Sequence, residues 1–463
     1  MKQTFTSTRN FTRHHPLITG TILLTSAGFL SRIIGFFYRI YLSRLFGEEG
    51  MGIYQLIHPL SALAFSLTAA AFQTAISKFV AAQACKTASE YEQKSYKPML
   101  IGLSISVPLS LAVMGILYFF AEPLATYYLQ ESRTLPLIRL LAFTVPFSAA
   151  HACINGYFYG IQKADVPAWT QLLEQFFRVG FVILLSTFFN HSDHTPSLTM
   201  AVLGLIIGEI AGFAGALIIL IRKRNKEKGL GITHSASSIT YRTLLAMVIP
   251  LSANRVFLNA LMSIEAATLP VCLKKYGYDT ATALSIYGVL TGMAFPLIFF
   301  PNALTGSVSV MLLPIISENI ALGRKSEIRK AVIQTIQYCS ILGFFCMAFF
   351  LFWGRFIGNL VFKSELAGYF ISELSFLCPF LYMNSTLSGI LQGLGKATSL
   401  FLSNMFALLL RLAIIFLTVP IFGIKGYLWG LLASQIIQTA SYLFILFFRK
   451  NLQTVSESSK LSK

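Results

Sequence analysis

The sequence predicts an all-α membrane protein that crosses the bilayer about twelve times. Of its 463 residues, 55% are hydrophobic and only 12% are charged, whereas soluble chains carry about 25% charged residues. A spanning helix needs about 20 apolar residues, so a chain of this length has room for roughly twelve helices and their connections. The two halves of the chain also resemble each other, which is typical of transporter folds.

Apolar windows of about 19 residues place these helices along the chain. The first six are expected at 17–45, 51–77, 99–121, 136–160, 169–189 and 198–221. The second six are expected at 243–272, 281–312, 331–353, 369–394, 398–420 and 426–448. The longest polar connection, from Arg222 to Ser238, separates the two sets. We therefore expect an N-terminal six-helix lobe over residues 1–230 and a C-terminal six-helix lobe over residues 231–463.

The distribution of basic residues predicts the orientation of the chain. Its 36 Lys and Arg against 18 Asp and Glu give a formal net charge of +18, which in a soluble protein would suggest nucleic acid as a partner. Here, 22 basic residues fall in the termini and in alternate connections, and only 6 on the opposite side. Because cytoplasmic loops are enriched in Lys and Arg, we expect a cell-membrane protein with both termini cytoplasmic. The basic cluster after Arg222 could also bind anionic membrane lipids.

A shift of 233 residues aligns the two halves. It pairs matching residues across three helices and two connections: Ile53-Tyr54 with Ile286-Tyr287, Pro146 with Pro379, Gly156 with Gly389, Lys163-Ala164 with Lys396-Ala397, and Arg178 with Arg411. Each half has an even number of spans, so both enter the membrane from the same side. The repeat is therefore expected to be parallel, with a pseudo-two-fold axis along the membrane normal, as in transporters that work by alternating access.

Two arginines on the first helix are candidate substrate ligands. An Arg at the centre of a spanning helix costs about 2.5–3.5 kcal/mol on insertion scales, so it normally faces a cavity or a partner. Arg32 and Arg39 are seven residues apart, close to two helical turns, and should share one face about 10 Å apart along the axis. They could clamp an elongated anion such as a diphosphate. Alternatively, they could reach the membrane interface or pair with a carboxylate.

Further ionisable residues lie on later spans. On the seventh helix Arg255 is a candidate second-lobe ligand, and Glu265 is a candidate counter-ion or coupling carboxylate. Glu174 and Arg178 are four residues apart and are expected to neutralise each other. Arg411 has no acid at that spacing, so we consider it for a counter-ion or coupling role. Two more acids within spans, Glu209 and Glu373, have no assigned role.

The motifs of soluble enzymes are missing. The segment GLGKAT from Gly393 lacks the spacing and the Ser or Thr of a phosphate-binding loop, and no strand precedes it. The six cysteines fall mainly in apolar segments, without paired spacing or a nearby histidine, so they predict neither zinc nor disulfides. We expect no enzyme activity, no cofactor and no metal.

Three segments carry a resemblance to a known family: 30–56, with LSRIIGFFYRIYLSRLFGEEGMGIYQL, 144–174 and 286–318. They resemble the polysaccharide-exporter branch of the MOP superfamily, and more closely the stage V sporulation protein B family and lipid II flippases. The resemblance covers nearly the whole chain. It implies a two-lobed bundle that moves an isoprenoid-diphosphate-linked saccharide to the outer leaflet by alternating access, with Arg32 at the arginine of the family's S-R-x-x-G-F pattern.

The chain departs from the lipid II flippases in three respects. Those proteins have a further first-helix arginine six residues after the one at Arg32, where this chain has Tyr38 with Arg39 adjacent. Those proteins carry an eighth-helix arginine near the position of Val289 or Leu290, so Arg255 could supply the second-lobe charge here. They also have fourteen spans, against the twelve expected here, and their extra pair helps to house the lipid tail.

Three functions remain open on the sequence. The first is a flippase for a lipid-linked saccharide or peptidoglycan precursor, with membrane lipids and envelope-synthesis enzymes as possible partners and no nucleic acid. The alternative is a cation-coupled multidrug exporter of the same superfamily. A third is a scaffold that recruits envelope-synthesis enzymes. Cationic drugs call for acids in the first lobe, whereas the first helix presents arginines and no acid before Glu48.

Overall fold

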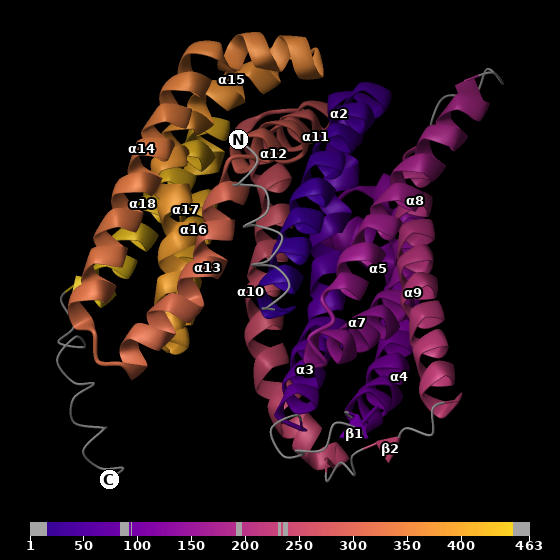
Figure 1. Cartoon of the computed structure of the whole chain (residues 1–463). Helices are drawn as coiled ribbons and strands as arrows, with labels where there is room; N and C mark the ends of the chain where they lie inside the picture. Colours follow the sequence, from indigo (N-terminus) through magenta and orange to yellow (C-terminus); the bar gives the residue numbers. More distant parts are fainter. Residues whose placement is uncertain are drawn as a thin grey trace, which may run out of the picture. The chain divides into compact units, whose positions relative to one another are not determined.

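The computed structural model describes residues 16–83, 92–93, 95–190, 197–229, 233–234 and 239–447. These residues are almost entirely helical (Figure 1). The basic residues of both termini, and part of the connection from Arg222 to Ser238, lie outside the described residues.

The first half of the chain alternates long helices with short irregular turns of helix. In chain order it contains α2 (Pro16–Phe65), η1 (Ser66–Ala70), α3 (Ala71–Gln83), β1 (Glu92–Gln93), α4 (Lys97–Phe119), α5 (Ala121–Pro123), η2 (Leu124–Tyr128), η3 (Ser132–Thr134), α6 (Leu135–Ala142), α7 (Thr144–Gly160), α8 (Asp165–Asn190), α9 (Leu198–Gly229) and β2 (Thr233–His234). The two short strands pair in parallel over two residues each.

The second half has the same organisation. It contains α10 (Tyr241–Tyr276), α11 (Thr280–Gly288), η4 (Val289–Ala294), α12 (Phe295–Phe299), α13 (Asn302–Ala321), α14 (Lys325–Ile357), η5 (Gly358–Phe362), α15 (Glu365–Leu374), η6 (Ser375–Leu377), α16 (Cys378–Gly393), α17 (Ala397–Phe422) and α18 (Ile424–Phe447).

The described helices confirm a polytopic membrane protein. Eleven helical segments are long and apolar enough to span a bilayer. The first of them, Ser26–Ala82, is 57 residues long and contains a non-helical residue at Gly47, where φ is +69°. Since about 20 residues suffice for one crossing, this segment holds both of the first two expected spans. About a dozen spans therefore follow from the described helices.

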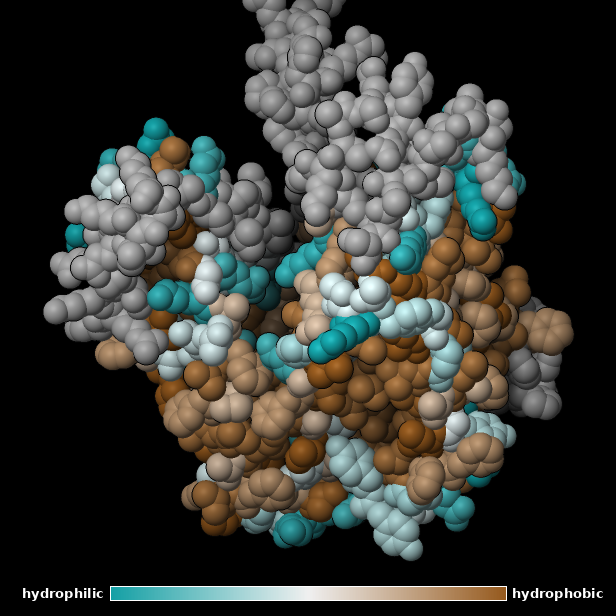
Figure 2. Space-filling view, turned by 90° about the horizontal axis from the view of Figure 1, so that it is seen from below, coloured by the Kyte–Doolittle hydropathy of each residue, from teal (hydrophilic) through white to brown (hydrophobic). Residues whose placement is uncertain are grey.

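Large apolar side chains cover much of the surface in a way that suits lipid. Phe119 and Phe352 are each 79% exposed, and Trp429 is 72% exposed. Figure 2 shows many hydrophobic residues on the surface seen from below, with hydrophilic residues interspersed among them. Monomeric soluble proteins rarely expose apolar patches of this extent.

Three expected spans contain breaks that hydropathy did not predict. The span expected at 136–160 is divided at Phe143 into α6 and α7, and the span expected at 369–394 is divided by η6 into α15 and α16. Pro146 and Pro379 lie in the first turns of α7 and α16. The N–H groups of a first turn have no acceptor within the helix, so a proline there costs no helical hydrogen bond. The span expected at 281–312 is interrupted between α12 and α13, at Pro301.

The backbone confirms the internal repeat. Gln130 and Lys363, which are 233 residues apart, both have positive φ, at 52° and 55°. Each follows a π-helical turn, η2 or η5, and each is followed by an N-cap residue in extended conformation. Gln162 and Gly395 form a second such pair, with φ of 61° and 72°. Conformations that L-residues rarely adopt thus recur at the same register in both halves.

The chain divides into two compact units. Unit 1 comprises residues 1–38 and 56–263, and unit 2 comprises residues 39–55 and 264–463. In unit 1, α8 packs along α9 and α7 packs against α3 and α4; in unit 2, α17 packs along α18 and α16 packs against α13 and α14. These are the same pairings under the 233-residue shift, so the repeat holds in packing as well as in sequence.

Within unit 2, Gly52 on α2 makes a close backbone crossing with α11. A Cβ at Gly52 would lie 2.1 Å from the carbonyl oxygen of Leu284, so the helices would have to separate. We expect Gly52→Ala to destabilise the protein by about 1–3 kcal/mol, the usual cost of overpacking. The melting temperature of detergent-purified protein measures the effect. Gly115→Ala on α4, with no atom within 4 Å of its new Cβ, is the matched control, and equal melting temperatures for the two variants would contradict the expectation.

Candidate functional site

Arg32 lies on the part of α2 that belongs to unit 1, and its side chain is exposed. It makes no hydrogen bond or ion pair to another described residue. Three residues further on, Gly35 faces α8, because a Cβ there would lie 3.9 Å from Nε2 of Gln175. Arg32 is therefore a cation on a spanning helix without a carboxylate partner among the described residues.

The next two arginines of α2 belong to unit 2. Arg39 is exposed. Arg44 donates from Nε to the carbonyl of Val361 at 3.0 Å, and from Nη2 to the carbonyls of Val361 and Leu360 at 2.7 and 3.2 Å. It thereby satisfies carbonyls in η5, beside the left-handed Lys363. Arg44 has a structural role that explains its position near the end of the first span.

Arg255 was expected to supply a charge of the second lobe, but it lies on the part of α10 that belongs to unit 1, and it is half-buried. Its Nη2 donates to Oγ1 of Thr74 on α3 at 3.2 Å, and its carbonyl accepts from Nδ2 of Asn259 at 3.0 Å. Lys78, one turn beyond Thr74 on α3, is exposed. Arg255 thus has a hydroxyl as its side-chain partner, so its charge is not neutralised by this contact.

The repeat-related arginines Arg178 and Arg411 have the opposite environment. Arg178 forms an ion pair with Glu174, as the four-residue spacing predicted. Arg411 on α17 pairs with Glu265 on α10, with Nη2 2.5 Å from Oε2. The hydroxyl of Tyr427 on α18 donates to the other oxygen of Glu265 at 3.0 Å. The structure therefore brings two of the candidate residues together, and Glu265 pairs with Arg411 rather than with Arg255.

Four of the arginines on spanning helices form two classes. Arg178 and Arg411 are compensated by a carboxylate in the same unit. Arg32 and Arg255, both in unit 1, have no carboxylate partner among the described residues. A cation on a spanning helix requires a partner or a polar environment. Arg32 and Arg255 are therefore available to bind an anion, whereas the compensated pairs are not.

Sequence reasoning left one buried polar cluster without a role. His151 on α7, Glu174 on α8 and Glu209 on α9 bring one potential ligand atom each to within 4.8 Å of one another. From the sequence, His151 was not identified as a candidate site residue, and Glu209 was assigned no role. One signal was available: glycines at 204, 208, 212 and 215 recur along one side of α9, which allows α8 to approach closely.

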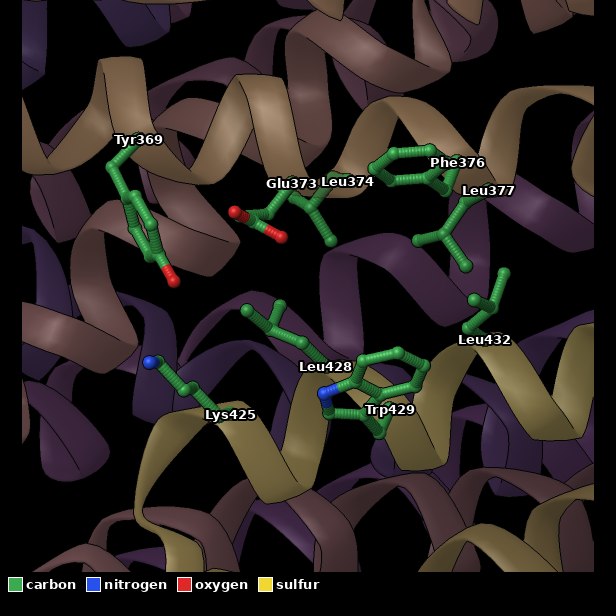
Figure 3. Close-up of a pocket in the computed structure, with 9 residues that line it drawn as sticks. All are labelled: Tyr369, Glu373, Leu374, Phe376, Leu377, Lys425, Leu428, Trp429 and Leu432. Carbon is green, nitrogen blue, oxygen red and sulfur yellow. The ribbon is translucent and has the colours of Figure 1, made fainter.

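Unit 2 contains a separate recess between α15 and α18 with a volume of about 570 Å³. Six apolar or aromatic residues and three polar ones line it: Leu374, Phe376, Leu377, Leu428, Trp429, Leu432, Tyr369, Glu373 and Lys425. Figure 3 shows Tyr369, Glu373 and Lys425 toward one end and Phe376, Leu377 and Leu432 toward the other. An apolar wall with polar groups at one end is the chemistry that suits an amphiphile.

Comparison with known proteins places this geometry in context. Residues 17–320 match the family described as polysaccharide biosynthesis protein. Stage V sporulation protein B of Bacillus subtilis (strain 168) is 28% identical over 430 residues, covering 91% of this chain and 82% of that protein. The lipid II flippase MurJ of the same organism is 25% identical over 338 residues, covering 69% of this chain and 61% of that protein.

Solved structures agree on the fold. The lipid II flippase MurJ in an inward closed conformation matches with a TM-score of 0.70 at 17% identity, covering 95% of this chain and 91% of that chain. The MATE multidrug transporter DinF-BH matches with a TM-score of 0.68 at 15% identity, covering 94% of this chain and 96% of that chain. At such identities the matches show a shared fold, and they include both flippases and drug exporters.

Proposed function

Because this chain belongs to the polysaccharide biosynthesis protein family, we propose that it flips a lipid-linked saccharide or peptidoglycan precursor across the cell membrane by alternating access. The coarser description is established by its relatives: it is a membrane transporter of the MOP superfamily. The finer proposal concerns the substrate, which we take to be an isoprenoid diphosphate that carries a sugar.

The observation that carries this proposal is the uncompensated charge of Arg32 and Arg255. Both are on spanning helices of unit 1, and neither has a carboxylate partner among the described residues. Guanidinium groups bind phosphate oxygens through charge-assisted hydrogen bonds. A diphosphate would supply the charge that these side chains lack. We retain Arg39, exposed on α2, as a third proposed ligand.

The charge pattern also bears on the runner-up, a cation-coupled multidrug exporter. The structural similarity to DinF-BH favours that alternative at the level of fold. However, Glu174 and Glu265 are each bonded to an arginine of their own unit. These two carboxylates are therefore not free to neutralise a cationic drug, and Glu209 on α9 lies beside Glu174 in a cluster with His151. A scaffold that recruits envelope-synthesis enzymes stays a third proposal, and such enzymes are possible partners of the flippase.

Flipping by the purified protein in liposomes tests the proposed function. The liposomes carry a fluorescent undecaprenyl-diphosphate saccharide, and a membrane-impermeant reductant quenches only the outward-facing label. Protein that flips the lipid should increase the quenched fraction beyond the value in empty liposomes. Unchanged quenching of this lipid, together with transport of an organic cation by the same preparation, would reject the proposal in favour of an exporter.

We also propose that both termini and the Arg222–Arg242 connection face the cytoplasm, as the basic residues predict. Cysteine labelling in intact cells tests this orientation. Ser132 and Ser326 are both exposed and lie on opposite sides of the predicted topology. Ser132→Cys should react with an impermeant maleimide and Ser326→Cys should not; the reverse pattern would invert the topology. Five native cysteines are buried, and Cys85 is replaced to lower the background.

A further inference from the structure

The cluster of His151, Glu174, Arg178 and Glu209 in unit 1 contains none of the residues proposed to bind the substrate. It joins three spanning helices, since His151 is on α7, Glu174 and Arg178 are on α8, and Glu209 is on α9. Ionisable groups inside a membrane are costly, and they mark proton or ion pathways when they are not simply paired. The ion pair of Glu174 with Arg178 accounts for two of these four groups, which leaves His151 and Glu209.

His151 provides an independent indication of a ligand. Its side chain is only 7% exposed, and its Nε2 has no hydrogen-bond partner within the described part of the chain. Leaving a buried polar atom unpaired costs about 1–3 kcal/mol. A ring nitrogen of this imidazole lies within 4.8 Å of carboxylate oxygens of Glu174 and Glu209. The imidazole with this unpaired nitrogen therefore lies beside the two carboxylates.

Two glycines of α9 make the close arrangement possible. A Cβ at Gly212 would lie 2.9 Å from Cε1 of His151, and one at Gly208 would lie 2.9 Å from the carbonyl oxygen of Glu174. Any larger residue at these positions would push α7 or α8 away from α9. The sequence thus keeps the imidazole and both carboxylates within reach of one another.

The charge of the cluster selects the ligand. With a neutral imidazole, two glutamates and one arginine carry one net negative charge. A single monovalent cation would neutralise the cluster, whereas a divalent metal would leave it with one net positive charge in a medium of low dielectric constant, which is costly. Hard metal cations prefer oxygen ligands, whereas an imidazole nitrogen can accept a proton. The proton is therefore the cation that fits.

We propose that this cluster binds one proton, held between Glu209 and His151, and that the proton couples transport to the pH gradient across the membrane. This coupling to transport rests on the proposed transport function. In the loaded state the Glu209 carboxyl donates its O–H toward the imidazole, and Glu174 remains in its ion pair with Arg178. Release of the proton leaves the cluster with one net negative charge, so loading and release change its electrostatic state.

Among the ionisable groups of the surrounding helices, Arg178 is the charged group shown to contact the cluster. Arg139 on α6 lies over the ring of Tyr118, 5.8 Å from its centroid. Lys223 and Glu227, at the far end of α9, pair with each other. The hydroxyl of Tyr38 on α2 lies 3.7 Å from a Cβ built at Gly204, one turn from Gly208. Other titratable groups of the neighbouring helices are Arg32 on α2, Lys78 on α3, Lys97 on α4, Cys153, Tyr157 and Tyr159 on α7, Asp165 on α8, and Arg222, Arg224, Lys226 and Lys228 on the last turns of α9.

Infrared spectroscopy of the purified protein tests the site without any transport assay. Exposed glutamates have a pKa of about 4.3, so a protonated-carboxyl band that persists near pH 7 and disappears in base reports a shielded carboxyl. We expect the wild type to show this band, Glu209→Gln to lose it, and Glu122→Gln, which alters an exposed carboxyl of the same unit, to retain it. His151→Gln should displace the midpoint of its titration.

The opposite outcomes are equally specific. A wild type without the band, or a band that Glu209→Gln leaves intact, would overturn the site. Calorimetric binding of Zn²⁺ that His151→Gln abolishes would replace the proton by a metal. If Glu209→Gln does not give monodisperse protein, Glu209→Asp is used, and the band must then shift in frequency.

The coupling of flipping to the pH gradient is tested separately, in the same liposome assay. An imposed pH gradient should accelerate flipping by the wild type at least about 3-fold, and this acceleration should be lost in His151→Gln. A flipping rate that does not depend on the pH gradient would overturn the coupling. The infrared band would then still decide whether the cluster binds a proton. Absence of flipping altogether would count against the proposed function, and the infrared band would still report on proton binding.

Discussion

Replacing Arg32 or Arg255 with alanine is expected to abolish transport while the protein remains folded in the membrane. Neither side chain has a carboxylate partner among the described residues, so its removal leaves no buried carboxylate unpaired and eases insertion. Each lost contact between a guanidinium and a phosphate should cost about 1.5–3 kcal/mol, which corresponds to about 10–100-fold in affinity. The flipping rate in liposomes measures the loss, and membrane abundance measures folding. Arg39→Ala is expected to behave in the same way.

Matched variants separate substrate binding from structure. Arg139→Ala removes an exposed arginine that contacts the Tyr118 ring and should leave flipping near the wild-type rate. Arg44→Ala should lower protein stability, because its guanidinium satisfies carbonyls of Val361 and Leu360. Lysine at position 32 or 255 should restore only part of the activity, since it retains the charge but not the bidentate geometry. Wild-type rates in the alanine variants at 32, 39 and 255 would rule out the proposed anion site.

The helices and the repeat could be predicted from the sequence because their signals are local or periodic. A spanning helix is a continuous apolar stretch, and the 233-residue shift needs only residue identities such as Pro146 with Pro379. The breaks at Phe143 and Pro301 were missed, because hydropathy does not change where a helix is interrupted. The division between Tyr38 and Arg39 on a continuous helix is a property of packing, for which the sequence offers no boundary.

Pairing between ionisable residues could be predicted only within one helix. Glu174 and Arg178 were identified because four residues make one turn. The partners Glu265 and Arg411 are 146 residues apart, and helix periodicity carries no information across that distance. The same reason hid His151, whose neighbours come from two other helices. A stripe of glycines on α9 indicated close packing, but not which side chains would meet there.

Binding to the purified protein is expected to follow the phosphate groups of the ligand. Arg32 and Arg255 make unit 1 cationic on its spanning helices, and a positive potential attracts an anion and repels a cation. An undecaprenyl-diphosphate saccharide should bind tightly, the monophosphate should bind at least about 10-fold more weakly as charge-assisted contacts are lost, and undecaprenol should bind weakest. Tetraphenylphosphonium, a lipophilic cation, should not compete.

Salt and charge variants identify the source of this preference. Exposed charges are screened over about 8 Å at physiological ionic strength, and partly buried ones much less. Arg255 is half-buried, so added salt should weaken diphosphate binding less than it weakens binding to a fully exposed cluster. Arg255→Lys should retain more of the affinity than Arg255→Ala. Saturable binding of tetraphenylphosphonium with no detectable binding of any lipid diphosphate would overturn the flippase assignment, because a site built on uncompensated arginines has no carboxylate with which to hold a cation.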